Sequence, residues 1–159
     1  MALELLNEVP DVGTVLVPVG GGDLAAGVAA AVKGVRPSTR VIGVQTEGAA
    51  PLPTTLRTGR RHQIEGTAKT IAGGISMTVI LDNMAAFLAR HLDGCLLVSD
   101  DDLKRAMRDL AFEAKVVVEP SGAASFAAWS KYRQRLATPV VAIVSGGNVD
   151  SALLSEVLA

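Results

Sequence analysis

The chain has 159 residues, of which 49% are hydrophobic and only 3% aromatic, and its formal net charge is −1. This near-neutral balance offers no basic surface for nucleic acid or for an anionic membrane, and no apolar stretch reaches the roughly 18 residues of a membrane span. Cys95 is the only cysteine, which excludes an internal disulfide and a cysteine zinc cluster and favours a cytoplasmic location.

Strand-like and helix-like segments alternate in the first part of the chain. Residues 3–8 are typical of the end of a helix. The apolar run Thr14–Val19 contains β-branched residues and predicts a buried strand, the Ala-rich segment Leu24–Val35 predicts a helix, and Arg40–Gln45 predicts a second strand. A β-α-β order implies two parallel strands joined by a right-handed crossover.

The remaining elements continue this alternation. Residues 46–70 contain prolines and a basic run, so we expect a loop with at most one short helix. The further predicted elements are a helix over Thr78–His91, a strand at Leu96–Val98, helices over Asp100–Lys115 and Pro120–Arg135, a strand at Val140–Val144 and a closing helix capped by Asn148 or Asp150. The pattern predicts one α/β domain over residues 1–159, with three α/β/α layers and a mostly parallel sheet of about four strands.

The start of the helix over Asp100–Lys115 carries a specific signal. Ser99 precedes it as a cap, and Asp102 stands three residues later, which is a variant of the capping box.

Two glycine turns follow predicted strands. Gly20–Gly22 lies between a strand and a helix, where glycine permits a sharp turn and the free N–H groups of the helix start face an anion. Neither G-x-G-x-x-G nor G-K-[ST] is present. From spacing alone, a phosphate cradle and a plain turn with Asp23 as helix cap are equally good interpretations. Ser145–Asn148 is a second turn at the carboxyl end of a strand, where ligands gather in open α/β sheets.

Five motifs occur in a defined order, and they are Val17–Gly22, Arg40–Gln45, Thr70–Ile75, Val118–Ala123 and Ser145–Asp150. Together they resemble the serine/threonine dehydratases, pyridoxal-phosphate enzymes of fold type II that include serine racemase. The resemblance covers essentially the whole chain and matches the C-terminal half of such an enzyme, which implies a partial large domain. In the family, loss of water from a β-hydroxy amino acid gives a 2-oxo acid and ammonia, while the protein positions and tunes the cofactor.

The resemblance implies a cofactor site made of Gly20, Gly21, Gly22, Asp23, Gly74, Glu119, Ser145 and Asn148. The three consecutive glycines would cradle the cofactor phosphate. Gly74 would lie against the ring, and Glu119 would line the pocket. Ser145 would hydrogen-bond the pyridine nitrogen, and Asn148 would hold that turn.

The chain lacks the parts of the family's sequence that carry the catalytic lysine and the substrate-binding site. The Ser-x-Lys-x-Arg-Gly-Ala motif with the Schiff-base lysine is absent, as are the small domain and the first part of the large domain. The lysines of the chain are Lys33, Lys69, Lys104, Lys115 and Lys131, and none has a matching role. We therefore expect no catalytic residue here.

Two substitutions concern ligand binding. Asp23 replaces a usual fourth glycine, and a carboxylate 4–5 Å from a phosphate repels it by roughly 3–4 kcal/mol per unit charge at an effective dielectric near 20. Pyridoxal phosphate is thus the cofactor by resemblance, but this substitution argues against its being bound. Gln45 and Pro51 stand where serine racemase-like members carry metal-binding acidic residues, so we expect no metal.

Three functional hypotheses follow. The chain is a dehydratase-like cofactor scaffold without turnover alone, or a homo-oligomeric interaction protein, or a non-catalytic binder of a phosphate ligand. Half of an α/β domain exposes apolar surface that seeks a partner. We therefore expect a homodimer, or association with a separate N-terminal half, and no nucleic-acid or membrane partner.

Overall fold

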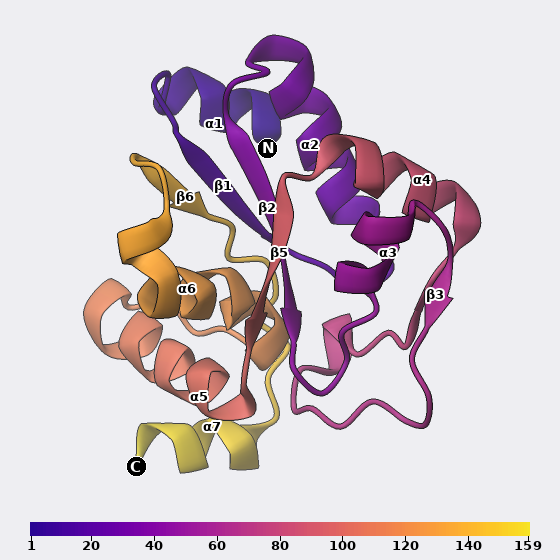
Figure 1. Ribbon diagram of the computed structural model, residues 1–159. Helices are drawn as coiled ribbons and strands as arrows, with labels where there is room; N and C mark the ends of the chain where they lie inside the picture. Colours follow the sequence, from indigo (N-terminus) through magenta and orange to yellow (C-terminus); the bar gives the residue numbers. More distant parts are fainter.

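A four-stranded parallel sheet forms the centre of the molecule (Figure 1). The computed structural model describes residues 1–159. The strands follow the order β5-β2-β1-β6, with bounds Gly94–Val98, Arg40–Thr46, Thr14–Pro18 and Val140–Ala142. Thr14 of β1 is aligned with Arg40 on one side and Val140 on the other. Every residue of β1 is buried, which explains its continuous apolar run. The predicted α/β class is confirmed.

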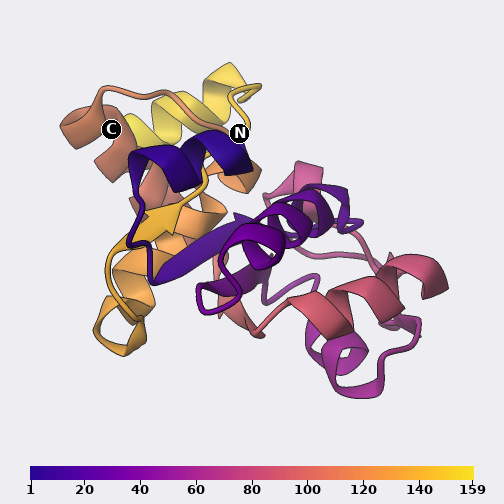
Figure 2. The same ribbon diagram turned by 90° about the horizontal axis from the view of Figure 1, so that it is seen from above.

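Helices cover both faces of the sheet. One face carries α1 (Ala2–Glu8), α2 (Asp23–Val35), α3 (Leu52–Thr58) and α4 (Asp82–His91), and the other carries α5 (Asp100–Asp109), α6 (Pro120–Tyr132) and α7 (Ser151–Leu158). Side chains of β1 alternate between the two cores, with Val15 and Val17 in the first and Leu16 in the second. In Figure 2, α4 lies on the opposite side of the molecule from α6 and α7. The predicted three-layer arrangement is confirmed.

The segment before α4 differs from the prediction of a helix over Thr78–His91. Val79–Ile80 forms strand β4, which pairs antiparallel with β3 (His62–Gln63), and α4 begins only at Asp82. Ile80 is fully buried, so its apolar character serves a strand as well as a helix. A helical period is judged from neighbouring residues, and the strand that pairs with Val79–Ile80 lies too far away in the sequence to be included.

Three further elements end earlier in the sequence than predicted. The helix from Asp100 is α-helical only to Asp109, continues as a π-helical turn over Leu110–Ala114, and ends where Lys115 takes a left-handed φ of 59°. Helix α6 ends at Tyr132, followed by a 3-10 turn over Arg133–Arg135. Strand β6 ends at Ala142. The expected short helix within residues 46–70 is α3.

The residues that cap α5 and α7 agree with the prediction, and the cap of α2 does not. Ser99 and Asp102 form the predicted capping box of α5, and Asp150 caps α7 by accepting the N–H groups of Ala152 and Leu153. Asp23, by contrast, is not a cap, because the N-cap of α2 is Gly22 with a left-handed φ of 111°. No helix combines the length and the apolar character that crossing a membrane requires.

Candidate ligand pocket at the carboxyl end of the sheet

A pocket of about 210 Å³ lies where β1 and β6 end. It brings together seven of the eight predicted site residues, which are Gly20, Gly21, Gly22, Asp23, Gly74, Glu119 and Ser145. These residues are far apart in the sequence. They meet because the carboxyl ends of parallel strands lie at the same edge of the sheet. This is the edge where open α/β sheets bind ligands. Asn148 lies outside this lining and is exposed.

The glycine turn after β1 presents free donors to this pocket. None of the N–H groups of Gly20, Gly21 and Gly22 bonds to a backbone carbonyl. Gly22 has a φ of 111°, a backbone conformation that residues with a side chain rarely adopt. A Cβ on Gly20 would lie 3.1 Å from the carbonyl oxygen of Gly74, so the two pocket walls approach closely there. The turn therefore has the features of an anion cradle at the start of a helix.

The wall formed by Gly74 is fixed by a residue that the sequence reasoning passed over. The N–H of Gly74 donates to Ser121 Oγ at 2.9 Å. Ser121 is buried in the first turn of α6 and also lines the pocket. It belongs to the motif Val118–Ala123, in which the resemblance assigns a role to Glu119 but none to Ser121. A hydroxyl in the first turn of a helix that starts with proline was the available signal.

The turn after β6 packs against the start of α6. Glu119 donates its N–H to the carbonyl oxygen of Gly146 at 3.0 Å. A Cβ on Gly122 would lie 2.7 Å from the Gly146 nitrogen, and one on Gly146 would overlap the Glu119 carboxylate. Close approach of two backbones therefore requires glycine at Gly122, whereas a side chain at Gly146 would displace the Glu119 carboxylate from the pocket. This contact places Ser145 and Glu119 on the same side of the pocket.

The pocket contains two carboxylates and no cationic side chain. Asp23 is exposed at the first position of α2, and Glu119 is half-buried. Backbone N–H groups are therefore its only electropositive feature. Four lysines are engaged elsewhere: Lys33 with Asp93, Lys104 with Glu156, Lys115 with the Phe112 carbonyl and Lys131 with Asp102. Lys69 is exposed and does not line the pocket.

The donors present fit a phosphate-bearing ligand, and the pocket lacks an amine. Three free N–H groups and a turn that only glycine can form suit a phosphate. Ser145 supplies a hydroxyl at the opposite wall. No side chain in the lining can form a Schiff base, because that bond requires an amine.

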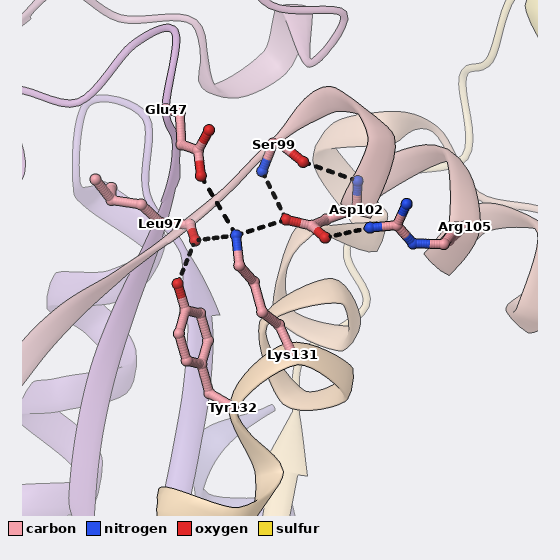
Figure 3. A network of polar contacts seen from close by, with 7 residues as sticks. All are labelled: Glu47, Leu97, Ser99, Asp102, Arg105, Lys131 and Tyr132. Atoms are coloured by element: carbon pink, nitrogen blue, oxygen red, sulfur yellow. Dashed lines mark hydrogen bonds and ion pairs between the residues drawn. The ribbon is translucent and has the colours of Figure 1, made fainter.

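A charged network joins the first turn of α5 to the end of α6 (Figure 3). Asp102 accepts hydrogen bonds from Lys131 at 2.7 Å and from the Ser99 N–H at 2.9 Å. Burial alone would raise the pKa of Asp102, but the hydrogen bonds from Lys131 and Ser99 outweigh it and hold that pKa at about 2. Tyr132 donates its hydroxyl to the Leu97 carbonyl at 2.9 Å. The network ties α5 and α6 to the end of β5.

Comparisons with known proteins find relatives over almost the whole chain. The family described as pyridoxal-phosphate dependent enzyme matches residues 1–146. L-threonine ammonia-lyase of Thermotoga maritima is 35% identical over 158 residues, which cover 99% of this chain and 39% of the relative.

Solved structures extend the likeness to the fold. The threonine deaminase of tomato, Solanum lycopersicum, in its processed isoform 2, matches with a TM-score of 0.89 and 33% identity, over 98% of this chain and 46% of that one. Maize serine racemase matches with a TM-score of 0.87 and 32% identity, over 98% of this chain and 48% of that one. The chain thus spans about half the length of the relatives that it matches, or less.

Proposed function

The chain belongs to the family of pyridoxal-phosphate dependent enzymes, and from this membership we propose that it is a serine/threonine dehydratase-like cofactor scaffold that does not turn over substrate alone. The observation that carries the proposal is the glycine turn Gly20–Gly22, with three free N–H groups in a pocket without a lysine. We treat residues 1–159 as one domain that forms part of a large cofactor-binding domain.

The chain's own residues would divide the work of holding the cofactor. The glycine N–H groups would hold the phosphate, Gly74 would lie beside the ring, and the Ser145 hydroxyl would meet the pyridine nitrogen. Glu119 would line the pocket, and Asn148 would stabilise the turn after β6. When bound, pyridoxal phosphate supplies an electron sink for carbanion chemistry on an amino acid. The amine and the substrate-carboxylate site would have to come from outside this chain.

The proposal includes a partner along the edge of β6. An apolar groove of about 390 Å³ runs between α1 and this edge, lined by Val141, Ile143 and Val144 among others. Val116 and Val117 are also exposed, at 43% and 54%. An unpaired strand edge beside apolar surface is suited to strand addition. A second copy of this chain, or a polypeptide that supplies the N-terminal half, would cover it.

A cytoplasmic location is part of the same proposal. Cys95 has no disulfide partner, and burial raises the pKa of its thiol to about 12, so it stays protonated and inert. A chain that relies on no disulfide suits a reducing compartment.

A second candidate function is that of a phosphate-ligand binder without any cofactor chemistry. The free N–H groups favour it equally, since they recognise phosphate whatever it is attached to. The two functions differ in whether the pyridine ring adds affinity. Comparing pyridoxamine phosphate with inorganic phosphate therefore separates them.

The test is a titration of pyridoxamine 5′-phosphate, whose ring fluoresces and which cannot react with surface lysines. We expect weak binding to the native chain and about tenfold tighter binding to Asp23→Asn, because the carboxylate beside the glycine turn repels phosphate in a partly screened environment. Asp11→Asn is the control, since Asp11 is exposed before the amino end of β1. Inorganic phosphate should compete only weakly.

Pyridoxal phosphate with borohydride tests the missing amine. No pocket residue should become labelled, and a single stoichiometrically labelled lysine would contradict the proposed lack of competence. Absence of binding by both the native chain and Asp23→Asn would refute the cofactor scaffold. Equal affinity for inorganic phosphate would favour the plain phosphate binder.

A further inference from the structure

Asp100, the first residue of α5, is bonded to a segment that lies thirty residues earlier in the sequence. Its Oδ1 accepts the hydroxyl of Thr70 at 2.6 Å, and its Oδ2 accepts the N–H of Ile71 at 3.2 Å. The Thr70 hydroxyl oxygen also accepts the Ala72 N–H at 3.2 Å. One carboxylate therefore fixes both the side chain and the backbone where this segment begins. Bonds to an ionised acceptor are the stronger kind of protein hydrogen bond.

The same segment ends at the pocket. After Ala72 it forms a 3-10 turn over Gly73–Ile75, and Gly74 and Ile75 line the pocket. The Gly74 N–H is held by Ser121 of α6, and the Gly74 carbonyl faces Gly20. Ala72 and Ile75 are buried in the core, whereas Gly73 and Gly74 are exposed. The exposed part of the segment is therefore held over the glycine turn by hydrogen bonds at both ends as well as by the packing of these two side chains.

The anchor at Asp100 has a rigid base. Helix α5 begins with the Ser99 capping box, and Asp102 in the same turn is bonded to Lys131 of α6 (Figure 3). The two helices α5 and α6 therefore hold opposite ends of the pocket segment, through Asp100 and Ser121, and are bonded to each other. Supporting contacts of this kind keep a binding site in its productive geometry.

We propose that Asp100 is a positioning residue for the pocket: by holding Thr70 and Ile71, it sets the Gly74 wall and thereby the affinity for a phosphate-bearing pyridine ligand. This inference rests on the proposed function for the ligand, whereas the ordering of the segment is independent of it. Asp101 is the natural comparison, because it shares the helix turn and the charge but is exposed and makes no hydrogen bond through its side chain.

The experiment measures hydrogen exchange of residues 71–76 by mass spectrometry, together with pyridoxamine 5′-phosphate affinity. We expect Asp100→Asn and Thr70→Val to speed exchange of this segment and to weaken binding, each by about tenfold, the equivalent of one charge-assisted hydrogen bond. Asp101→Asn should behave as the native chain, since it alters the helix charge alone. Thr70→Ser should also do so, because it keeps the hydroxyl.

The outcomes separate the two proposals. Native-like exchange of the segment in both Asp100→Asn and Thr70→Val overturns the positioning role. Equal effects of Asp100→Asn and Asp101→Asn also overturn it, because they point to helix charge rather than to the bonds. If neither the native chain nor Asp23→Asn binds pyridoxamine phosphate, the proposed function fails and so does the link to affinity, while faster exchange in Asp100→Asn still supports the anchor.

Discussion

Among the single residues, the carboxylate of Asp102 accepts hydrogen bonds from Ser99, Arg105 and Lys131. Its side chain is only 11% exposed and is paired with Lys131 and Arg105. Its pKa of about 2 in the folded chain lies below the usual value near 3.8. Because the folded pKa is lowered, the ionised form stabilises the fold above the unfolded pKa. That contribution is lost as the pH falls from about 4 toward 2.

Asp102→Asn should lower the free energy of unfolding at neutral pH by about 2 kcal/mol, since each unit of pKa shift corresponds to about 1.4 kcal/mol. Urea unfolding at several pH values measures it. The loss should shrink between about pH 4 and 2 and vanish in stronger acid, where native Asp102 is protonated. Asp101→Asn is the control, because Asp101 lies in the same helix turn but is exposed. A deficit that persists unchanged below pH 2 would contradict this account.

Sequence predicted only the local half of this network. The Ser99 and Asp102 pair was visible because a capping box has a fixed spacing. Lys131 could not be assigned, because it is 29 residues away and meets Asp102 only when α5 packs on α6. The same reason hid the bond between Gly74 and Ser121, which are 47 residues apart. Of the two interpretations of the glycine turn, the one with Asp23 as helix cap is wrong, because Gly22 occupies the cap position.

At the scale of elements, the contact between α6 and the turn after β6 sets the far wall of the pocket. Gly122 lies in the first turn of α6, directly against the backbone of Gly146. Backbone atoms cannot rotate away as a side chain can, so a methyl group must push the turn and the helix apart. Since Ser145 precedes Gly146, this displacement would also move a pocket residue.

Gly122→Ala should destabilise the fold by about 1–3 kcal/mol, because strain from overpacking outweighs the gain in helix propensity. Gly27→Ala is the matched control, since Gly27 is an exposed helix glycine with nothing within 4 Å of an added Cβ. It should stabilise by about 0.5–1 kcal/mol. Thermal and urea unfolding measure both. If Gly122→Ala instead stabilised the fold, the turn at Gly146 would have to move away from α6 without strain, which would contradict this account.

Most elements could be predicted from periodicity, but their ends could not. Strand β1 and helix α2 stand out because composition and burial agree along their length. Strand β4 was missed because two residues carry no period, and its pairing with His62–Gln63 is a tertiary contact. The π-helical turn at Leu110–Ala114 keeps the helical pattern of side chains, so only the backbone distinguishes it.

At the scale of the whole molecule, the sheet has an open edge at β6 and the chain spans about half of its relatives. Figure 1 shows β6 at one side of the sheet, with α1 beside it. A second apolar groove of about 360 Å³, between α1 and α2, shares Met1 with the groove at β6. Two apolar grooves therefore border the first helix, and one of them extends to the open edge of the sheet.

Two copies that paired through β6 would cover this edge symmetrically, since a two-fold axis places the same surface on both sides. Val144 is 39% exposed in the groove. Val144→Lys should weaken the dimer at least tenfold, because each copy would desolvate a charge. Val35→Lys is the control, since Val35 is 59% exposed at the end of α2 and lines neither groove. Light scattering at micromolar concentration should find native chain and Val35→Lys dimeric, and Val144→Lys largely monomeric. A native monomer would exclude self-association through β6, and equal weakening by both lysines would place the contact elsewhere.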